Sequence, residues 1–415
     1  MHVGIFGGSF DPFHSGHLTL IRSALSAGRL DHLVVIPAGS PPHKDSTRMT
    51  PAAHRYFMTA AALAGEPGVS VSDAEMSREG PTYTIDTLRS LRGRFGPDAT
   101  LYLVVGADIV FDIRSWRFPD QVFAESVLYL AMRPGFRRAD VEARADELRV
   151  QFGARIEVFD ADTPDVSATA LREALRTGGD LRDRLPAPVL SYIRKHALYP
   201  DANPLDAVPD ETMDRLAGFE RRLFTALGPS RLRHSLCCMT ETVRLGLQNG
   251  VDPAKAALAG LLHDCAKSLP PEAEQEYARR MSPPLDEMTL DSHELLHAPL
   301  CARIAEETFG ISDPEILHAI RYHTTGCPGM NTLDKVLFLA DKIEPTRSFP
   351  SVEDLRAAAD DLDGAVLALL KFTEDYLRDK EKHLHPDSTA ARRWLEEGMA
   401  CRDGGTAGPE RKENT

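Results

Sequence analysis

The stretch GIFGGSFDPFHSGHL, Gly4 to Leu18, decides the fold of the first part of the chain. A short apolar run enters two adjacent glycines, and a helix-like run closed by Gly28 follows. This order predicts a β-strand, a glycine turn and a helix. The glycine spacing is not G-x-G-x-x-G, and no G-K-[ST] follows it. A dinucleotide fingerprint and a P-loop are therefore both excluded.

Two histidines, His14 and His17, stand at the start of this predicted helix. Their three-residue spacing places them on one side of a helical turn, and Gly16 removes a side chain between them. Amides at a helix N-terminus attract phosphate, and imidazoles beside them can donate to a phosphoryl group that gains charge. Two surface histidines near a helix cap are the alternative. We interpret the pair as part of a phosphoryl-transfer site.

Strands and helices alternate through the first 200 residues. Further strands are predicted at HLVVIPAG, ATLYLVVGAD, SVLYLAMRPG and RIEVFDAD, with helical segments such as AAHRYFMTAAALAG and TIDTLRSLRGRFG between them. This alternation indicates an α/β domain with a mostly parallel sheet that is wound on both faces.

The second half has a different pattern. A stretch with three prolines and four acidic residues, LYPDANPLDAVPDE, separates it from the first, and beyond this stretch apolar residues recur at helical spacing. We therefore predict an α/β domain over residues 1–200, a linker at 201–210, an all-α helical bundle over 211–400 and a flexible tail at 401–415.

Composition limits the class of protein. The chain has 415 residues, 42% hydrophobic and 27% charged, with a net charge of −14. These values predict a globular protein of two or three domains and argue against a general nucleic-acid binder, although a local basic pocket is still allowed. No apolar run is long enough for a membrane span, and no signal peptide precedes the first strand. All six cysteines lie after residue 236 without a C-x-x-C pair, so we expect reduced thiols and a cytoplasmic location.

The opening stretch resembles the H-x-G-H signature of the nucleotidyltransferase superfamily, with Ser9 where threonine is usual. A second signature of that superfamily is matched by VSATALR, Val166 to Arg172, in which Ala168 replaces a serine. Ser167 can cap a helix, and a cation near the first turn opposes the helix dipole by roughly 0.3–1 kcal/mol. An anion held by Ser167, Thr169 and Arg172 would reverse this cost. An exposed arginine on a solvated helix face is the alternative.

Several further stretches resemble nicotinate-nucleotide adenylyltransferase: GSPPHK, GPTYTIDTL, GADIVFDIRSW and RPG. The resemblance implies a Rossmann-like nucleotidyltransferase fold and adenylyl transfer from ATP, with Mg²⁺, to nicotinate mononucleotide, giving deamido-NAD and pyrophosphate. Trp116 would stack on the pyridine ring. The residues implied as catalytic are His14, His17, Lys44 and Arg172. Those implied in substrate binding are Gly7, Gly8, Ser9, Phe10, His43, Tyr83, Thr84, Gly106, Asp108, Trp116, Arg133, Ser167 and Thr169.

The second half carries histidines and aspartates in RLRHSL, LLHDCAK, LLHAPL, RYHTTG and LADKIEP. A vicinal His-Asp pair in an apolar helix is costly unless it is partnered, and such side chains from separate helices can converge in a bundle core. Nitrogen and oxygen donors without sulfur suit Fe, Mn or Zn, and an aspartate can bridge two metal ions. Taken singly, each histidine could be a satisfied core residue. The candidate ligands are His234, His263, Asp264, His297, His323 and Asp341.

This half resembles the HD-domain phosphohydrolases, and within them the YqeK family, over about residues 211 to 395. The resemblance implies a dimetal centre, in the first place of iron, with manganese or other divalent ions as alternatives. It also implies symmetrical hydrolysis of diadenosine tetraphosphate to two ADP, with Lys267 in the catalytic site and Lys267 and Arg347 on substrate phosphate. His293 and His318 fall outside the pattern and are interpreted as structural.

Three alternatives stay open. The transferase could prefer nicotinamide mononucleotide or another acceptor. The HD half could act on another nucleotide, or could sense nucleotides without turnover. A homo-oligomer is compatible with the sequence.

Overall fold

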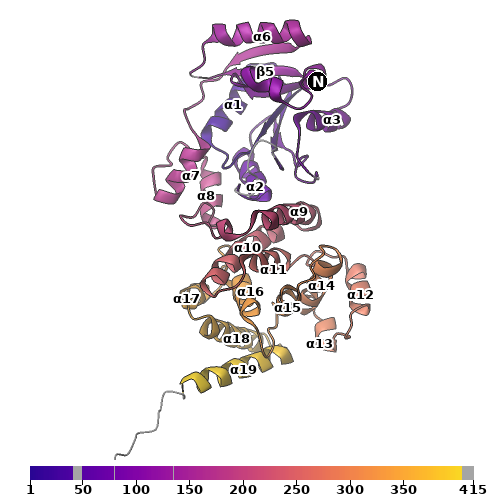
Figure 1. Ribbon diagram of the computed structural model, residues 1–415, viewed down its shortest axis with the longest axis vertical. Helices are drawn as coiled ribbons and strands as arrows, with labels where there is room; N and C mark the ends of the chain where they lie inside the picture. Colours follow the sequence, from indigo (N-terminus) through magenta and orange to yellow (C-terminus); the bar gives the residue numbers. More distant parts are fainter. Residues whose placement is uncertain (41–48, 79, 134, 404–415) are drawn as a thin grey trace, which may run out of the picture. The chain divides into compact units, whose positions relative to one another are not determined.

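The computed structural model describes residues 1–40, 49–78, 80–133 and 135–403. It divides into two compact units. The first contains Met1–Asn203 together with Glu220–Thr225, and the second contains Pro204–Phe219 and the chain from Ala226 onward. In Figure 1 the strands belong to the N-terminal part of the chain and the C-terminal part is helical.

The first unit is built on one parallel sheet of six strands. Its spatial order is β3-β2-β1-β4-β5-β6. The strands are β1 (His2–Gly8), β2 (His32–Pro37), β3 (Val69–Val71), β4 (Thr100–Gly106), β5 (Val127–Met132) and β6 (Arg155–Asp160). Five were predicted; β3 was missed because it has three residues, too few to show a period. The direction of winding reverses between β1 and β4, so a crevice is expected at the carboxyl ends of these strands.

Helices cover both faces of this sheet, which confirms the predicted doubly wound class (Figure 1). One hydrophobic core joins one face to α1 (Ser15–Ser26), α2 (Ala52–Leu63) and α8 (Ala187–Lys195). A second core joins the opposite face to α3 (Thr84–Phe95), α5 (Pro119–Glu125) and α6 (Arg138–Phe152). Two short elements, α4 (Ile109–Asp112) and η2 (Ile113–Ser115), follow β4, and α7 (Ala168–Thr177) follows β6.

The segment predicted as a linker contains regular structure. A short 3₁₀-helix, η3 (Pro204–Ala207), lies within it, and Leu205 and Val208 are buried. Helix α9 (Asp210–Ala226) follows, and its residues 220–225 are grouped with the first unit. Two apolar side chains of this stretch are therefore packed away from solvent.

The described part of the second unit is helical throughout, as expected for a bundle. Its helices are α10 (Pro229–Gln248), α11 (Pro253–Leu262), α12 (Pro271–Arg279), α13 (Glu287–Leu290), α14 (His293–Glu307), α15 (Pro314–Tyr322), α16 (Thr332–Ile343), α17 (Val352–Ala358), α18 (Leu362–Asp379) and α19 (Pro386–Asp403). Packing among α10, α11, α14, α15 and α16 forms its centre. Helix α19 continues to Asp403, three residues into the predicted tail, and residues 404–415 lie outside the described part.

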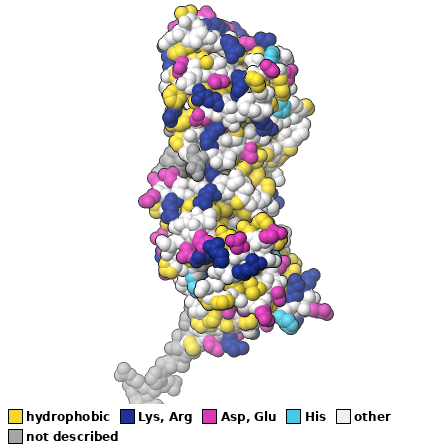
Figure 2. All heavy atoms as spheres, turned by 90° about the vertical axis from the view of Figure 1, so that its right-hand side faces the viewer, with side chains coloured by type: hydrophobic (Ala, Val, Ile, Leu, Met, Phe, Trp, Pro, Cys, Tyr) yellow, Lys and Arg dark blue, Asp and Glu magenta, His cyan; other side chains and the backbone are white. Residues whose placement is uncertain are grey.

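Among the described residues, no helix combines the length and apolarity that crossing a membrane requires. On the face shown in Figure 2, Lys and Arg side chains are interspersed with Asp and Glu.

Glu220 completes the start of α2. The residue before that helix is Pro51, whose side chain cannot accept a hydrogen bond, and the Ala53 amide donates to Glu220 Oε1 at 2.6 Å. Burial raises the pKa of Glu220, although the hydrogen bond from Ala53 opposes this. An acceptor from α9 thus satisfies an amide that the helix itself leaves unpaired.

We expect Glu220→Ala in the full chain to destabilise the first unit by about 1–3 kcal/mol, because a buried amide loses its acceptor. Glu211→Ala, which removes an exposed carboxylate from the same helix, is the matched control and should have little effect. Urea unfolding followed by a probe in the first unit measures both. Equal midpoints for the two variants would contradict the assigned role of Glu220.

Candidate active sites

His14 and His17 meet at the start of α1. His14 is the N-cap residue, its ring stacks on that of His17 with centroids 3.6 Å apart, and its amide donates to His17 Nδ1 at 3.2 Å. The predicted placement on one side of the turn is confirmed. Because Nδ1 of His17 accepts, the neutral ring carries its proton on Nε2, where it can donate. Burial, and secondly Arg133, lower the pKa of His14 to about 4, so this ring is neutral near pH 7.

The glycines of this turn make room for aromatic rings. A Cβ on Gly16 would lie 3.1 Å from the His14 ring, and a Cβ on Gly8 would lie 2.8 Å from the ring of Phe10. Gly16 lines a cavity of this unit, so the expectation that a ligand approaches its backbone stays a prediction; the missing side chain also makes room for the His14 imidazole. These glycines are required by side chains of the motif itself.

A cleft opens at the carboxyl ends of β1 and β4, where the winding reverses. We call it the switch-point cleft. The predicted residues that line it are Gly7, Gly8, Ser9, Phe10, His14, His17, Gly106, Asp108, Trp116 and Arg133. Two of its buried polar atoms, His14 Nδ1 and Arg133 Nε, have no hydrogen-bond partner among the described residues. Such atoms are costly in isolation and suit a polar ligand.

Arg133 is held beside Asp108 on the β4 side of the cleft. Its guanidinium donates to Asp108 Oδ1 at 2.5 Å. A Cβ on Gly106 would lie 1.7 Å from the guanidinium, so only glycine admits this ion pair. The Arg133 guanidinium therefore lies at the cleft with its positive charge partly balanced by the Asp108 carboxylate.

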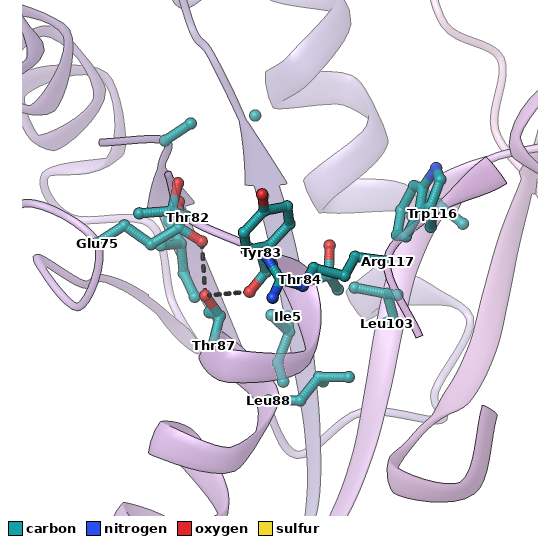
Figure 3. A pocket seen from close by; sticks show the side chains of 15 residues that line it. Ile5, Glu75, Thr82, Tyr83, Thr84, Thr87, Leu88, Leu103, Trp116 and Arg117 are labelled. Carbon is teal, nitrogen blue, oxygen red and sulfur yellow. Dashed lines mark hydrogen bonds between the residues drawn. The ribbon is translucent and has the colours of Figure 1, made fainter. Parts of the chain in front are cut away.

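A second cavity, the side pocket, adjoins the cleft and shares Gly7, Gly8 and Trp116 with it. It contains the predicted acceptor residues Tyr83 and Thr84 (Figure 3). It also contains Arg117, which the sequence reasoning missed. The Arg117 guanidinium lies 4.4 Å from the centroid of the Tyr83 ring, and no described carboxylate forms an ion pair with it.

The only carboxylate that lines the side pocket among the described residues is Glu75, which is buried. It accepts a hydrogen bond from Thr87 Oγ1 at 2.7 Å (Figure 3). The pocket therefore offers an aromatic face, a hydrogen-bonded acid and an exposed guanidinium.

The second motif is placed differently from the expectation. Ser167 is the N-cap residue of α7, but its side chain makes no capping bond. Arg172 is the fifth helical residue, so it lies beyond the first turn, and it donates to the Asp11 carbonyl at 2.7 Å and to Thr169 Oγ1 at 3.3 Å. In this motif only Val166 lines the switch-point cleft. The Asp11 carbonyl and the Thr169 hydroxyl are therefore the contacts of Arg172 within the protein, and its contact with an anion stays a prediction.

His43 and Lys44, predicted to contact phosphate, lie outside the described residues.

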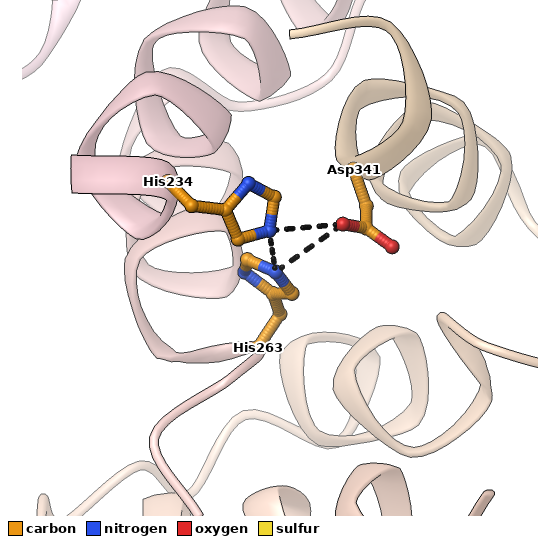
Figure 4. Close-up of side chains that lie close together, drawn as sticks. All are labelled: His234, His263 and Asp341. Atoms are coloured by element: carbon orange, nitrogen blue, oxygen red, sulfur yellow. Dashed lines mark hydrogen bonds and ion pairs between the residues drawn. The ribbon is translucent and has the colours of Figure 1, made fainter. Parts of the chain in front are cut away.

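In the second unit, the six predicted ligands converge from five helices, and all six are buried. His234 and Asp341 lie within α10 and α16, and their ligand atoms are 3.0 Å apart. His263 follows the end of α11, with its Nε2 3.1 Å from that of His234 (Figure 4). His263 and Asp264 were expected inside a helix, but α11 ends at Leu262. The helix end turns both side chains inward.

Asp264 lies between two sets of imidazoles. Its Oδ1 is 3.2 Å from His297 Nε2 and 3.9 Å from His323 Nε2. Its Oδ2 is 3.5 Å from His263 Nε2 and 3.6 Å from His234 Nε2. Two donor groups that could each hold a metal ion share His263: one is His234, His263 and Asp341, and the other is His263, Asp264 and His323. If two divalent ions bind here, the Asp264 carboxylate would be the group placed to bridge them, because it faces the imidazoles of both groups.

Outer partners orient the ligand rings. His263 and His323 direct Nδ1 to main-chain carbonyls at 2.8 and 2.7 Å, which leaves Nε2 for the centre. His234 directs Nδ1 to Glu344 at 3.1 Å. Burial alone would raise the pKa of Glu344, but hydrogen bonds from His234 and Thr346 lower it. Glu344 was not predicted; its signal was the second-last position of LADKIEP, an acid directly after an apolar helix.

A cavity beside this cluster is rich in donors. We call it the arginine cavity; Arg231 and Arg347 line it together with Ser268. The two arginines form ion pairs with Asp264 and Asp341 respectively. Lys267 does not line the cavity, and its Nζ lies 2.8 Å from Nδ1 of His297.

The histidines interpreted as structural have partners outside the cluster. His293 pairs with Glu274 at 2.8 Å, and His318 pairs with Asp334 at 3.0 Å.

Comparison with known proteins agrees with both halves. The model of the cytidylyltransferase-like family matches residues 5–174, and that of the HD domain matches residues 231–346. Two proteins named "Probable nicotinate-nucleotide adenylyltransferase" are 36% and 38% identical to this chain. The first, from Thermoanaerobacter sp. (strain X514), aligns over 48% of this chain and 94% of its own length. The second, from Laribacter hongkongensis (strain HLHK9), aligns over 49% of this chain and 96% of its own.

A solved structure from Clostridium acetobutylicum, titled as a predicted HD superfamily hydrolase involved in NAD metabolism, is 38% identical. It covers 44% of this chain and 97% of its own, with a TM-score of 0.43. The fold and sites define a nucleotidyltransferase unit joined to an HD domain. Through its first half, the chain belongs to the nicotinate-nucleotide adenylyltransferase family.

We expect Asp264→Ala to abolish binding of both metal ions, because its carboxylate faces both groups of imidazoles, whereas His323→Ala should still retain one. Asp252→Asn, which preserves the N-cap of the helix leading to His263, is the control and should bind two. Metal content after loading with iron or manganese measures all three. One ion retained by Asp264→Ala would contradict the bridging position.

Proposed function

We propose that the first unit transfers an adenylyl group from ATP to the phosphate of nicotinate mononucleotide, giving deamido-NAD and pyrophosphate. The observation that carries this proposal is the junction of two cavities at Trp116. The switch-point cleft carries the paired histidines at a helix N-terminus, and the side pocket carries aromatic and cationic groups. The first relative named for this activity aligns with 48% of this chain over 94% of its own length.

In this reaction a phosphate oxygen of the acceptor attacks the α-phosphorus of ATP, and the bond to pyrophosphate breaks. No enzyme residue needs to form a covalent intermediate, so the rate depends on positioning and charge stabilisation. The Nε2–H of His17 and the unpartnered Nε of Arg133 are donors for charge on the phosphates. Mg²⁺ enters with ATP. His43 and Lys44 stay predicted phosphate contacts, and Gly7, Gly8 and Asp108 stay predicted nucleotide contacts.

We further propose that the second unit hydrolyses diadenosine tetraphosphate. Water adds to a phosphorus of the tetraphosphate, a bridging P–O bond breaks, and two ADP leave. When bound, two divalent ions, iron or manganese, supply Lewis acidity and an activated water. Arg231 and Arg347 support this proposal because they present guanidinium groups to a cavity at the ligand cluster, where they can hold phosphate oxygens.

A nucleotide hydrolysis screen tests this second activity. Formation of ADP alone from diadenosine tetraphosphate supports it. Turnover confined to another nucleotide, or binding without turnover, would replace it with one of the alternatives stated above.

The reduced cysteines favour a cytoplasmic enzyme: all six are free thiols in the structure, and five are buried.

We expect His17→Ala to lower adenylyl transfer at least a hundredfold, because it removes a donor to developing charge. Pyrophosphate release with ATP and nicotinate mononucleotide measures the loss. His2→Ala, a change at the far end of β1, serves as the control. Near-normal turnover by a folded His17→Ala protein would exclude the assignment.

We expect Arg117→Gln to reduce discrimination between the acid and amide mononucleotides about tenfold or more, because a guanidinium pairs with a carboxylate but not with an amide. The ratio of kcat/KM for nicotinate and nicotinamide mononucleotides measures this. Arg114→Gln removes a nearby arginine that pairs with Glu147 outside the pocket and should preserve the ratio. An unchanged ratio in Arg117→Gln would show that Arg117 does not read the carboxylate.

A further inference from the structure

Asp11 lies inside the first motif but lines neither cavity of the first unit. It is 6% exposed, and three elements hold it. Its Oδ1 accepts from the Tyr199 hydroxyl at 2.6 Å, its Oδ2 from the Thr50 amide at 3.4 Å, and its carbonyl from Arg172 at 2.7 Å. Asp11 thus joins the opening motif to the second motif and to the end of the unit.

Tyr199 is 188 residues from Asp11 in the sequence. Its φ is +58°, a left-handed conformation that a tyrosine adopts only when its surroundings hold it. Burial, and secondly the Asp11 carboxylate, raise the pKa of Tyr199 well above its usual value. The hydroxyl therefore stays protonated and donates to Asp11 at all physiological pH values.

Arg55 also binds the loop that contains Asp11. It is 2% exposed, and its guanidinium donates to the carbonyls of Ser9 at 2.8 Å, Gly39 at 3.2 Å and Thr50 at 2.9 Å. Burial lowers the pKa of Arg55, and the nearby Asp11 carboxylate opposes this. A buried cation requires such a counter-charge. The loops that follow β1 and β2 are thereby tied to one guanidinium.

Phe10 connects this network to the histidine pair. It too has a left-handed backbone, with φ of +48°, and its ring meets that of His17 edge-on at a centroid distance of 4.9 Å. The same ring closes over Gly8. Because Phe10 and Asp11 are adjacent, a shift of Asp11 changes the surface against which the His17 imidazole rests.

We propose that Asp11 and Tyr199 are positioning residues for adenylyl transfer: the Tyr199 hydroxyl fixes Asp11, and the loop so fixed places Phe10 against His17. The inference rests on the proposed transferase function and adds to it residues that touch no substrate. A purely structural bond is the alternative, in which loss of the hydroxyl would lower stability alone.

Tyr199→Phe in the full chain tests the proposal, with Tyr192→Phe as the matched control. The Tyr192 hydroxyl also has a side-chain hydrogen-bond partner within the same unit, His54 Nδ1 at 2.9 Å. We expect Tyr199→Phe to lower kcat about tenfold with both KM values within about twofold, since transition-state alignment is lost rather than binding. Tyr192→Phe should keep kcat. Equal kcat values for the two folded variants, at comparable Tm, would overturn the proposal.

Asp11→Asn provides the second arm. Asparagine keeps an oxygen that can accept from Tyr199, so this variant should retain more activity than Asp11→Ala. The double variant Asp11→Ala with Tyr199→Phe should be no slower than Asp11→Ala alone, because each change already breaks the same hydrogen bond between the two residues. Additive losses in kcat would overturn the link between the two residues.

A measurement without substrate separates this proposal from the proposed function. The imidazole NMR resonances of His17 depend on the adjacent Phe10 ring, so Tyr199→Phe should shift them and Tyr192→Phe should not. If the natural chain does not turn over nicotinate mononucleotide, the proposed function fails. The His17 resonances still show whether Tyr199 positions the His17 ring. Unshifted resonances in Tyr199→Phe would overturn it.

Discussion

Buried imidazole and carboxylate groups must find partners, because removing them from water costs more than any single contact returns. The second unit depends on this constraint most directly. Six such side chains meet in a helical core. The Nδ1 atom of each imidazole has a partner outside the cluster, which leaves Nε2 facing the centre. Asp264 faces imidazoles with both oxygens. Helices that would otherwise pack through apolar contacts alone are thereby fixed in register.

The first unit meets the same constraint without a cluster of ligands. His14 is buried as a neutral ring, and the guanidinium of Arg55 is enclosed by carbonyls. Among the neighbouring charged groups, the Asp11 carboxylate most strongly opposes the lowering of the Arg55 pKa by burial. Phosphate can then be met by amides and neutral imidazoles, which are already in place and need no counter-ion. The two units thus provide partners for their buried polar and charged groups by different means.

Much of this arrangement could be predicted from the sequence where the signal was local. The strand, glycine turn and helix around His14 and His17 follow one another directly between His2 and Ser26, and four more strands show long apolar runs. The candidate ligands of the second unit could be predicted because histidine and aspartate in apolar surroundings are costly unless they have a partner. Strand β3 was missed because Val69–Val71 is too short to carry a period.

The contacts that could not be predicted join residues far apart in the chain. No local pattern shows that Arg172 contacts the Asp11 carbonyl or that Glu220 accepts from the start of α2. Arg117 was overlooked because an arginine beside a tryptophan is common on a surface, and only the fold turns it toward Tyr83. A shortened chain that ends at residue 200 would lack Glu220, although Glu220 belongs to the first unit and accepts from the Ala53 amide there.

A net charge of −14 repels polyphosphates at long range, but net charge acts weakly at the distance of a binding site. Screening at physiological salt limits exposed charges to about 8 Å, so the nearest groups decide the local potential. Arg133 lines the switch-point cleft, and Arg231 and Arg347 line the arginine cavity. The acidic surface remains useful because it disfavours long nucleic-acid backbones, while a short nucleotide that enters a cavity meets guanidinium groups first.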